Sequence, residues 1–294
     1  MSGRFGAVLT AMATPFHEGG SLDLDGAQTL ARHLLDHGTD TLVVAGSTGE
    51  SPTLTHDEKR ELWRAVIEAA RGAGKVVCGT GTYATDDTIE LTGVAEELGA
   101  DGALVVTPYY NKPPQRGLLA HFTKVAESSS LPLILYNIPG RTATRIEHAT
   151  LLELAAVPTI VAVKDSTGDH EGVSRLIREA PPDFELYSGD DWATFSFMAL
   201  GAKGIISVAS HLVGDRIREM CELIDAGDAA SARKLHDELS PVFSVLFITS
   251  NPIPLKAALE MVGLPAGPPR LPLVPATGEE RARIRATLED VGVL

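Results

Sequence analysis

The sequence is poor in cysteine, with only Cys78 and Cys221 in 294 residues. Two thiols cannot form a disulfide framework, and these two do not make a Cys-x-x-Cys pair. Both lie in apolar runs, so we expect them to be buried free thiols.

Basic residues are also scarce, with 25 Lys and Arg against 39 Asp and Glu, which gives a net charge of −14. This charge disfavours binding to nucleic acid and to anionic membranes, because both are polyanions. It also means that an anionic substrate needs a local cluster of cations. No apolar run is long enough to span a membrane, and the N-terminal stretch MSGRFGAVLTAMATPF lacks the pattern of a secretory signal. We therefore expect a soluble, cytoplasmic protein.

Short apolar runs alternate with helical patterns along most of the chain. Thr55 and Glu58 form a capping box, for example, before a helix with Leu62 and Val66 on its inner face. Several of the apolar runs are continuously apolar, as strands buried on both faces must be. The pattern predicts an α/β fold, a (β/α)₈ barrel, with a doubly wound open sheet as the alternative. The eight expected strands are 7–12, 41–45, 76–78, 103–106, 133–136, 160–163, 185–187 and 204–208.

Strand patterns stop after about Asp215, and helical patterns continue to the end. Within this part, Asn251-Pro252 is typical of a helix cap followed by proline at the first helical position. No low-complexity linker separates the two parts. We expect the barrel over residues 1–225 and a C-terminal helical region, packed on the barrel, over residues 226–294.

Lys164 directly follows the apolar run of the sixth expected strand. A lysine at such a place usually extends to water. In a (β/α)₈ barrel, however, the C-terminal ends of the strands carry the active site. Desolvation there disfavours the ammonium form, and a neutral amine can attack a ketone. Lys164 is therefore the leading candidate for a nucleophile.

Other strand ends carry further candidates. The turn Gly46-Ser47-Thr48-Gly49 follows the second strand, and successive N–H groups in such a turn can hold a carboxylate, although an ordinary helix-capping turn looks the same. Tyr110 and Tyr136 lie at the ends of the fourth and fifth strands, where they either relay protons or simply fill the barrel mouth. The segment 188–191, Ser-Gly-Asp-Asp, is either a wall of the site or a helix cap.

Motifs for cofactors and metals are weak or missing. Residues 79–84 match a dinucleotide pattern, but the next strand ends in Thr107-Pro108 instead of the acidic residue that holds a ribose. There is no Walker A motif, no zinc-binding His-Glu-x-x-His or paired Cys/His set, and no G-x-S-x-G elbow. We expect an enzyme without cofactor or metal.

The strand-end motifs, taken together, resemble those of the dihydrodipicolinate synthase / N-acetylneuraminate lyase family of class I aldolases. The resemblance covers nearly the whole chain, and several motifs in the same order are far more specific than any one. It is carried by AVLTAMATPF, GSTGESPTL, VTPYYNKP, LYNIPGRT, VAVKDSTG, SGDD, GIISV and NPIPLKAAL.

The resemblance implies a Schiff-base mechanism. Lys164 would form an imine with pyruvate, and loss of a methyl proton would give an enamine that attacks the aldehyde of aspartate semialdehyde. The substrate amine would then displace Lys164 and close a ring. Tyr136 would pass protons, and Ser47 and Tyr110 would complete the relay, with Tyr110 supplied by the neighbouring subunit of a homotetramer, a dimer of dimers.

The resemblance also implies the substrate contacts. Backbone donors of Ser47 and Thr48 would hold the pyruvate carboxylate, and Gly189 and Ile206 would place main-chain carbonyls near the imine. Arg141, in YNIPGRT, would receive the carboxylate of aspartate semialdehyde. That arginine is typical of the family's synthases, which act in lysine and diaminopimelate biosynthesis, and is absent from its sialic-acid lyases.

The chain departs from the synthase pattern at two places. The glycine turn has Ser47-Thr48, a form common among the lyases, where synthases usually have Thr-Thr. A pyruvate-dependent lyase of a sugar acid or other 2-oxo acid is therefore the alternative, and a non-catalytic barrel that binds a 2-oxo acid is the third reading. Lys59 and Tyr83 replace the histidine and asparagine of lysine-inhibited members, so we expect weak or absent feedback inhibition.

Overall fold

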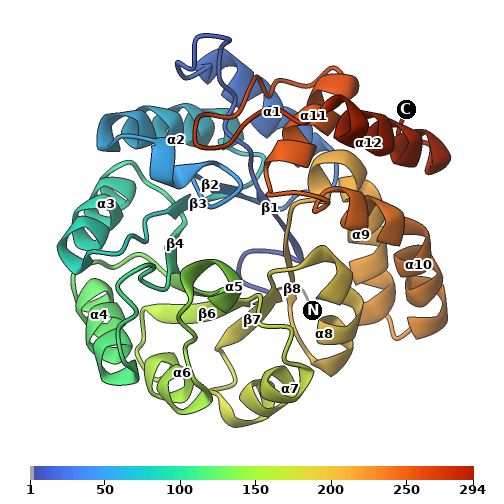
Figure 1. The fold of residues 1–294 in the computed structure, drawn as a ribbon. Coiled ribbons are helices and arrows are strands. Elements are labelled where there is room, and N and C mark those ends of the chain that lie inside the picture. The colour runs from blue at the N-terminus through green and yellow to red at the C-terminus, as the bar shows by residue number, and fades with distance from the viewer. Residues whose placement is uncertain (1–2) are drawn as a thin grey trace.

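A computed structural model describes residues 3–294, and within them the chain forms a closed barrel of eight parallel strands (Figure 1). The barrel closes because β8 pairs with β1, with Ile206 beside Leu9. The open-sheet alternative is therefore wrong, and the (β/α)₈ prediction is confirmed. All eight expected strands are present to within two residues at each end. They are β1 (Val8–Ala11), β2 (Thr41–Val44), β3 (Lys75–Gly79), β4 (Gly102–Val106), β5 (Leu133–Asn137), β6 (Ile160–Asp165), β7 (Glu185–Ser188) and β8 (Gly204–Ser207).

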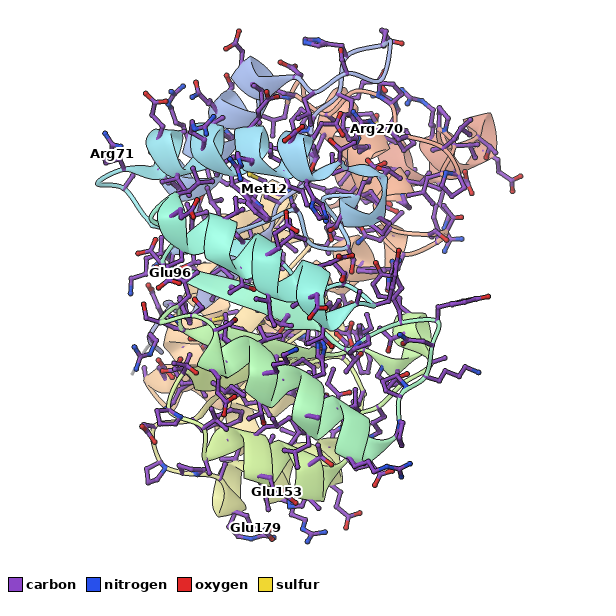
Figure 2. The ribbon with its side chains drawn as sticks, turned by 90° about the vertical axis from the view of Figure 1, so that its left-hand side faces the viewer. Met12, Arg71, Glu96, Glu153, Glu179 and Arg270 are labelled. Atoms are coloured by element: carbon purple, nitrogen blue, oxygen red, sulfur yellow. The ribbon has the colours of Figure 1, made fainter. Side chains whose placement is uncertain are left out.

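Helices surround the strands as an outer ring. The predicted capping box is present, since Thr55 Oγ1 accepts from the Glu58 N–H and Glu58 Oε2 accepts from the Thr55 N–H. In Figure 2, α2, α3 and α4 lie side by side on the outer wall. The helices of the ring are α1 (Leu24–Asp36), α2 (His56–Ala70), α3 (Thr85–Glu97), α4 (Gln115–Glu127), α5 (Pro139–Thr142), α6 (His148–Ala155), α7 (His170–Glu179), α8 (Thr194–Leu200) and α9 (Ser210–Asp225), with the short 3₁₀ helices η1 (Ser51–Thr53) and η2 (Asp191–Ala193).

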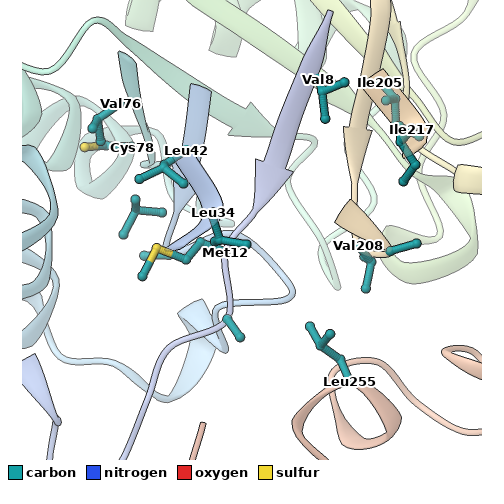
Figure 3. Close-up of a cluster of buried hydrophobic side chains, with 14 of the residues drawn as sticks. Val8, Met12, Leu34, Leu42, Val76, Cys78, Ile205, Val208, Ile217 and Leu255 are labelled. Atoms are coloured by element: carbon teal, nitrogen blue, oxygen red, sulfur yellow. The ribbon is translucent and has the colours of Figure 1, made fainter. Parts of the chain in front are cut away.

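The core has two parts. The larger lies between strands and helices, and Figure 3 shows Met12, Leu34, Leu42 and Cys78 among its side chains. The smaller fills the barrel interior and includes Phe5, Leu9, Val43, Val77, Leu104, Ile134, Tyr136, Ala162, Tyr187 and Ile206. Because side chains fill the interior, the barrel is a packed core and not a pore, and a ligand is expected at the C-terminal ends of its strands.

Three helices follow the barrel: α10 (Ala229–Val245), α11 (Ile253–Met261) and α12 (Gly278–Asp290). In Figure 1, α10 lies outside α9, and α11 and α12 lie near α1. Leu255 of α11 belongs to the same buried cluster as Val208 after β8 (Figure 3). The predicted cap at Asn251 is wrong, because Pro252 occupies the N-cap position and the Asn251 side chain bonds elsewhere.

Both cysteines are free and buried, as predicted. Burial raises the pKa of the Cys221 thiol to about 12 and raises that of Cys78 as well. Neither is therefore a reactive thiolate at neutral pH. Across residues 3–294, no helix combines the length and the apolarity needed to cross a membrane.

Candidate active site

A cavity of about 310 Å³ opens at the C-terminal ends of the strands. This is the end where the barrel fold places catalytic residues. Three of the residues singled out in the sequence line it: Ser47 after β2, Tyr136 in β5 and Arg141 in α5. Asn251 and the Pro272-Leu273 segment complete the wall from the C-terminal region. The cavity is thus built jointly by the barrel and the chain that follows it.

Lys164 lies within β6, which continues to Asp165, and its side chain is 5% exposed. In the β5–β6 ladder it lies directly opposite Tyr136. Its Nζ atom is 4.3 Å from the centre of the Tyr136 ring. Lys164 does not itself line the cavity but packs against a ring that does. The register of two neighbouring strands therefore places an amine beside a phenol at the edge of a ligand-sized space.

Gly189, which follows β7, packs against the stem of this lysine. A Cβ atom at that position would collide with Ser166 Oγ and would lie 3.1 Å from Lys164 Cε. The Gly189 N–H also donates to the Asp165 carbonyl at 2.7 Å. Glycine fits here because any side chain would collide with Ser166 Oγ and crowd both the Asp165 carbonyl and the stem of Lys164. Ile206 is fully buried in β8.

Two carboxyl groups, those of Asp190 and Asp191, lie near enough to the lysine to interact with its charge. Burial raises the pKa of Asp190 to about 6, although the nearby Lys164 lowers it and Asp191 raises it further. Asp191 accepts from the N–H groups of Val208 and Ala209, both at 3.1 Å. Its side chain therefore ties the β7 loop to the β8 loop and does not cap the following helix, so the cap reading of this segment is wrong at Asp191.

The glycine turn after β2 places its two hydroxyl residues differently. Ser47 lines the cavity, whereas Thr48 is buried behind it, with its Oγ1 bonded by Asn251 Nδ2 at 2.9 Å. The Gly49 carbonyl accepts from Thr14 Oγ1 at 2.7 Å. Side-chain hydrogen bonds from both ends of the chain thus fix the turn.

Arg141 brings a cation to the cavity wall. Its Nη2 donates to the Asn251 carbonyl at 3.2 Å. Within residues 3–294 this carbonyl is the only group that accepts a hydrogen bond from the guanidinium, so its other N–H groups are free for an anionic ligand. A planar fork of donors is suited to a carboxylate.

Tyr110 does not line the cavity of its own chain. Its side chain is 93% exposed, and its backbone has a φ of 73°. The preceding Tyr109 lines the cavity instead, with its ring edge-to-face against Tyr83 at 5.5 Å.

Reasoning from local sequence missed the residues that the C-terminal region contributes. The sequence predicts a helix cap at Asn251, yet this residue contacts both Thr48 and Arg141. No local pattern indicates a role for Glu50, which also lines the cavity. The sequence did contain one indication of this contribution. The motif NPIPLKAAL, which begins at Asn251, is among those that carry the family resemblance, although it lies outside the barrel strands. In the part of the chain that the structure describes, no group of three or more His, Cys, Asp and Glu side chains is placed to hold a metal ion.

Fold and site together define a (β/α)₈-barrel enzyme of the class I aldolase type, the class that works through lysine Schiff bases. Comparison with known proteins identifies the family within this class. The chain belongs to the dihydrodipicolinate synthetase family, whose model matches residues 4–291.

Close relatives cover the chain almost completely. It is 53% identical over 291 residues to a 4-hydroxy-tetrahydrodipicolinate synthase of Moorella thermoacetica, covering 99% of this chain and 100% of the relative. The corresponding synthase of Synechococcus elongatus is 49% identical over 290 residues, which cover 98% of this chain and 97% of the relative.

Solved structures of similar proteins share this fold. A dihydrodipicolinate synthase from Cyanidioschyzon merolae with lysine bound superposes with a TM-score of 0.97, at 44% identity and 99% coverage of both chains. The dihydrodipicolinate synthase from Acinetobacter baumannii, complexed with pyruvate, superposes with a TM-score of 0.96 at 39% identity. The match covers 99% of this chain and 100% of the other.

Proposed function

We propose that this chain condenses pyruvate with aspartate 4-semialdehyde through a Schiff base on Lys164, the reaction of 4-hydroxy-tetrahydrodipicolinate synthases in lysine and diaminopimelate biosynthesis. The observation that carries the proposal is the buried Lys164 amine against the Tyr136 ring, at a cavity whose wall presents Arg141. The relatives with this name match the chain from end to end.

The chemistry begins when the neutral Lys164 amine attacks the ketone carbon of pyruvate. Water leaves and a protonated imine forms. Loss of a methyl proton gives the enamine, whose carbon attacks the aldehyde of aspartate semialdehyde. The amine of that substrate then displaces Lys164 and closes the ring. Tyr136 passes protons at the imine, together with Ser47 and the partner subunit's Tyr110.

Each substrate carboxylate has its own site. Main-chain N–H groups of the Ser47-Thr48 turn hold that of pyruvate, and Arg141 holds that of the aldehyde. Carbonyl groups of Gly189 and Ile206 lie near the imine. Arg141 also supplies the local positive charge that an anionic substrate needs on a protein with a net charge of −14.

A second candidate is a pyruvate-dependent lyase of a sugar acid or other 2-oxo acid. It is favoured by Ser47, since serine at this place is common among the family's lyases. Arg141 favours the synthase, because it offers a fork of donors to a second carboxylate.

We further propose a homotetramer, a dimer of dimers, in the cytoplasm, with the barrel over residues 1–225 and the helical region over residues 226–294. Support for assembly comes from Tyr110, an aromatic ring left 93% exposed on a backbone with a φ of 73°. Such a ring is suited to contact a second copy. Sedimentation equilibrium tests this directly, and a monomer at assay concentration would contradict it.

The deciding experiment is a coupled assay with pyruvate and aspartate semialdehyde. We expect turnover by the wild type and a loss of about 10- to 100-fold in kcat/KM for the aldehyde in Arg141→Ala, because a charge-assisted bidentate contact is removed. Arg145→Ala is the matched control, since this nearby arginine pairs with Asp169 at an exposed site and is expected to behave like wild type. Cleavage of a sugar acid without activity on aspartate semialdehyde would support the lyase instead.

A further inference from the structure

Two residues of the C-terminal region hold the glycine turn after β2. Asn251 Nδ2 donates to Thr48 Oγ1 at 2.9 Å. Lys256 Nζ lies 2.6 Å from Glu50 Oε1. The two held residues flank Gly49, and the segment they fix includes Ser47, which lines the cavity.

Glu50 is held in an unusual conformation. Its φ of 56° lies in the left-handed region, which a side chain other than glycine rarely adopts. Its carboxylate is engaged on both oxygens, since Oε2 accepts from the Arg270 N–H at 2.8 Å. Strained backbone of this kind persists only where surrounding contacts determine it. Lys256 and the Arg270 backbone therefore fix the end of the turn.

Lys256 is equally constrained. Its side chain is 2% exposed and that of Glu50 is 1% exposed. Its Nζ also donates to the Pro268 carbonyl at 3.1 Å and lies 4.3 Å from the centre of the Phe16 ring. The Arg270 guanidinium carbon is 4.2 Å from the same ring centre. Figure 2 shows Arg270 toward one end of the barrel, away from Arg71 at the other.

An ion pair this deeply buried contributes little to stability, because desolvation of both charges offsets their attraction. The Glu50–Lys256 pair instead affects the conformation of the turn and the charge at the cavity wall. Glu50 lines the cavity, so an unneutralised carboxylate there would repel an anionic substrate. The ammonium removes that repulsion while it fixes the backbone.

We propose that Lys256 is a positioning residue for the 2-oxo acid: through Glu50 it holds the Ser47-Thr48 turn in the conformation that receives the substrate carboxylate. The inference rests on the proposed function, because it assumes that this turn binds pyruvate. Lys256 does not touch the substrate, and Lys164 remains the reacting amine.

The test is borohydride trapping of pyruvate, read by intact mass over a range of pyruvate concentrations. The main variant is the double substitution Glu50→Gln with Lys256→Met, which removes both charges and preserves shape. We expect its half-saturating pyruvate concentration to rise about tenfold or more, because the turn is no longer fixed. Trapping at saturating pyruvate stays near the wild-type level, because Lys164 and Tyr136 are untouched. A purely structural role would lower the melting temperature and leave the half-saturating concentration of the folded protein unchanged.

Two further variants complete the experiment. Glu50→Gln alone covers the case in which the double variant does not fold: burial already lowers the pKa of Lys256, so the lysine can lose its proton when its partner is neutral. The Glu50→Gln variant is expected to show the same rise in the half-saturating pyruvate concentration. Glu260→Gln is the control, since Glu260 lies in the same helix but pairs with Arg281 at the surface, and its titration should match wild type.

The outcomes distinguish a failure of the proposed function from a failure of the positioning role of Lys256. Absence of any wild-type adduct overturns the proposed function. A wild-type adduct, with half-saturation in Glu50→Gln and in the folded double variant within about twofold of wild type, overturns the positioning role alone.

Discussion

The Nζ atom of Lys164 lies 4.3 Å from the centre of the Tyr136 ring, and the two residues are direct neighbours across the β5–β6 ladder. The sheet register therefore sets the relation between amine and phenol. Because both side chains are 5% exposed, a proton that leaves the lysine or its imine has a protein group beside it rather than bulk water.

Tyr136→Phe keeps the ring that packs on Lys164 and removes only the hydroxyl. We expect kcat to fall by about 10²- to 10⁴-fold, the usual contribution of a positioned acid–base group. The melting temperature should change by no more than a few degrees, and pyruvate should still be trapped on prolonged incubation. Steady-state rates and thermal melts check this. A kcat close to wild type would remove Tyr136 from the proton relay.

Gly189→Ala adds a methyl group that collides with Ser166 Oγ and lies 3.1 Å from Lys164 Cε. We expect the amine to be displaced and kcat/KM to fall by about 10²-fold, together with an overpacking cost of about 1–3 kcal/mol. Gly93→Ala is the matched control, because Gly93 lies within α3 with no neighbour inside 4 Å. That substitution should stabilise the protein by about 0.5–1 kcal/mol and leave the rate unchanged. Equal activity in both variants would contradict the packing described for Gly189.

His211 makes the stability of the barrel depend on pH. Its Nε2 accepts from the Ala13 N–H and its Nδ1 donates to the Val208 carbonyl, and burial lowers its pKa to about 4 from an ordinary 6.5. The unfolded chain therefore takes up this proton first as the pH falls. The contribution of the neutral His211 to the free energy of unfolding is therefore fully present above pH 6.5 and is lost as the pH falls from 6.5 to 4.

Urea unfolding at about pH 7.5 and about pH 5 measures this effect. Wild type should lose about 2 kcal/mol more of its unfolding free energy over that interval than His211→Gln, in which the group is absent. Other titrating groups, such as Asp190, are common to both proteins and cancel in the comparison. Parallel losses in the two proteins would show that His211 is not held neutral.

Lysine is expected to inhibit this protein weakly or not at all. The family resemblance implies that Lys59 and Tyr83 stand where lysine-inhibited members have histidine and asparagine. Lys59 is buried, and desolvation lowers its pKa while Asp87 opposes the shift. A cation here would repel the effector's ammonium. Lys59→His combined with Tyr83→Asn should increase sensitivity in the synthase assay, whereas strong inhibition of the wild type by submillimolar lysine would refute the prediction.

The parts of the molecule that local sequence predicted are those set by local physics. Short apolar runs located all eight strands, because strands buried on both faces have no polar alternation to obscure them. The capping box at Thr55 and Glu58 was recognisable because both of its hydrogen bonds span three residues. Lys164 was recognisable because a charged residue ends an apolar strand.

Contacts between distant parts of the chain were not predictable in this way. Asn251 bonds to Thr48 across 203 positions, while its own neighbours suggest a helix cap. The Glu50–Lys256 pair joins segments that are just as far apart. Tyr110 follows a strand end as expected, yet it is almost fully exposed and does not line the cavity of its own chain. Such relations depend on how the C-terminal helices pack on the barrel, which no local pattern encodes.

Reduction with borohydride in the presence of pyruvate, followed by peptide mapping, tests the central claim most directly. If Lys164 forms the Schiff base, one pyruvyl increment will appear, it will map to the peptide that contains Lys164, and Lys164→Ala will abolish it. The absence of an increment in the wild type, or an increment on another lysine that survives Lys164→Ala, would contradict the mechanism.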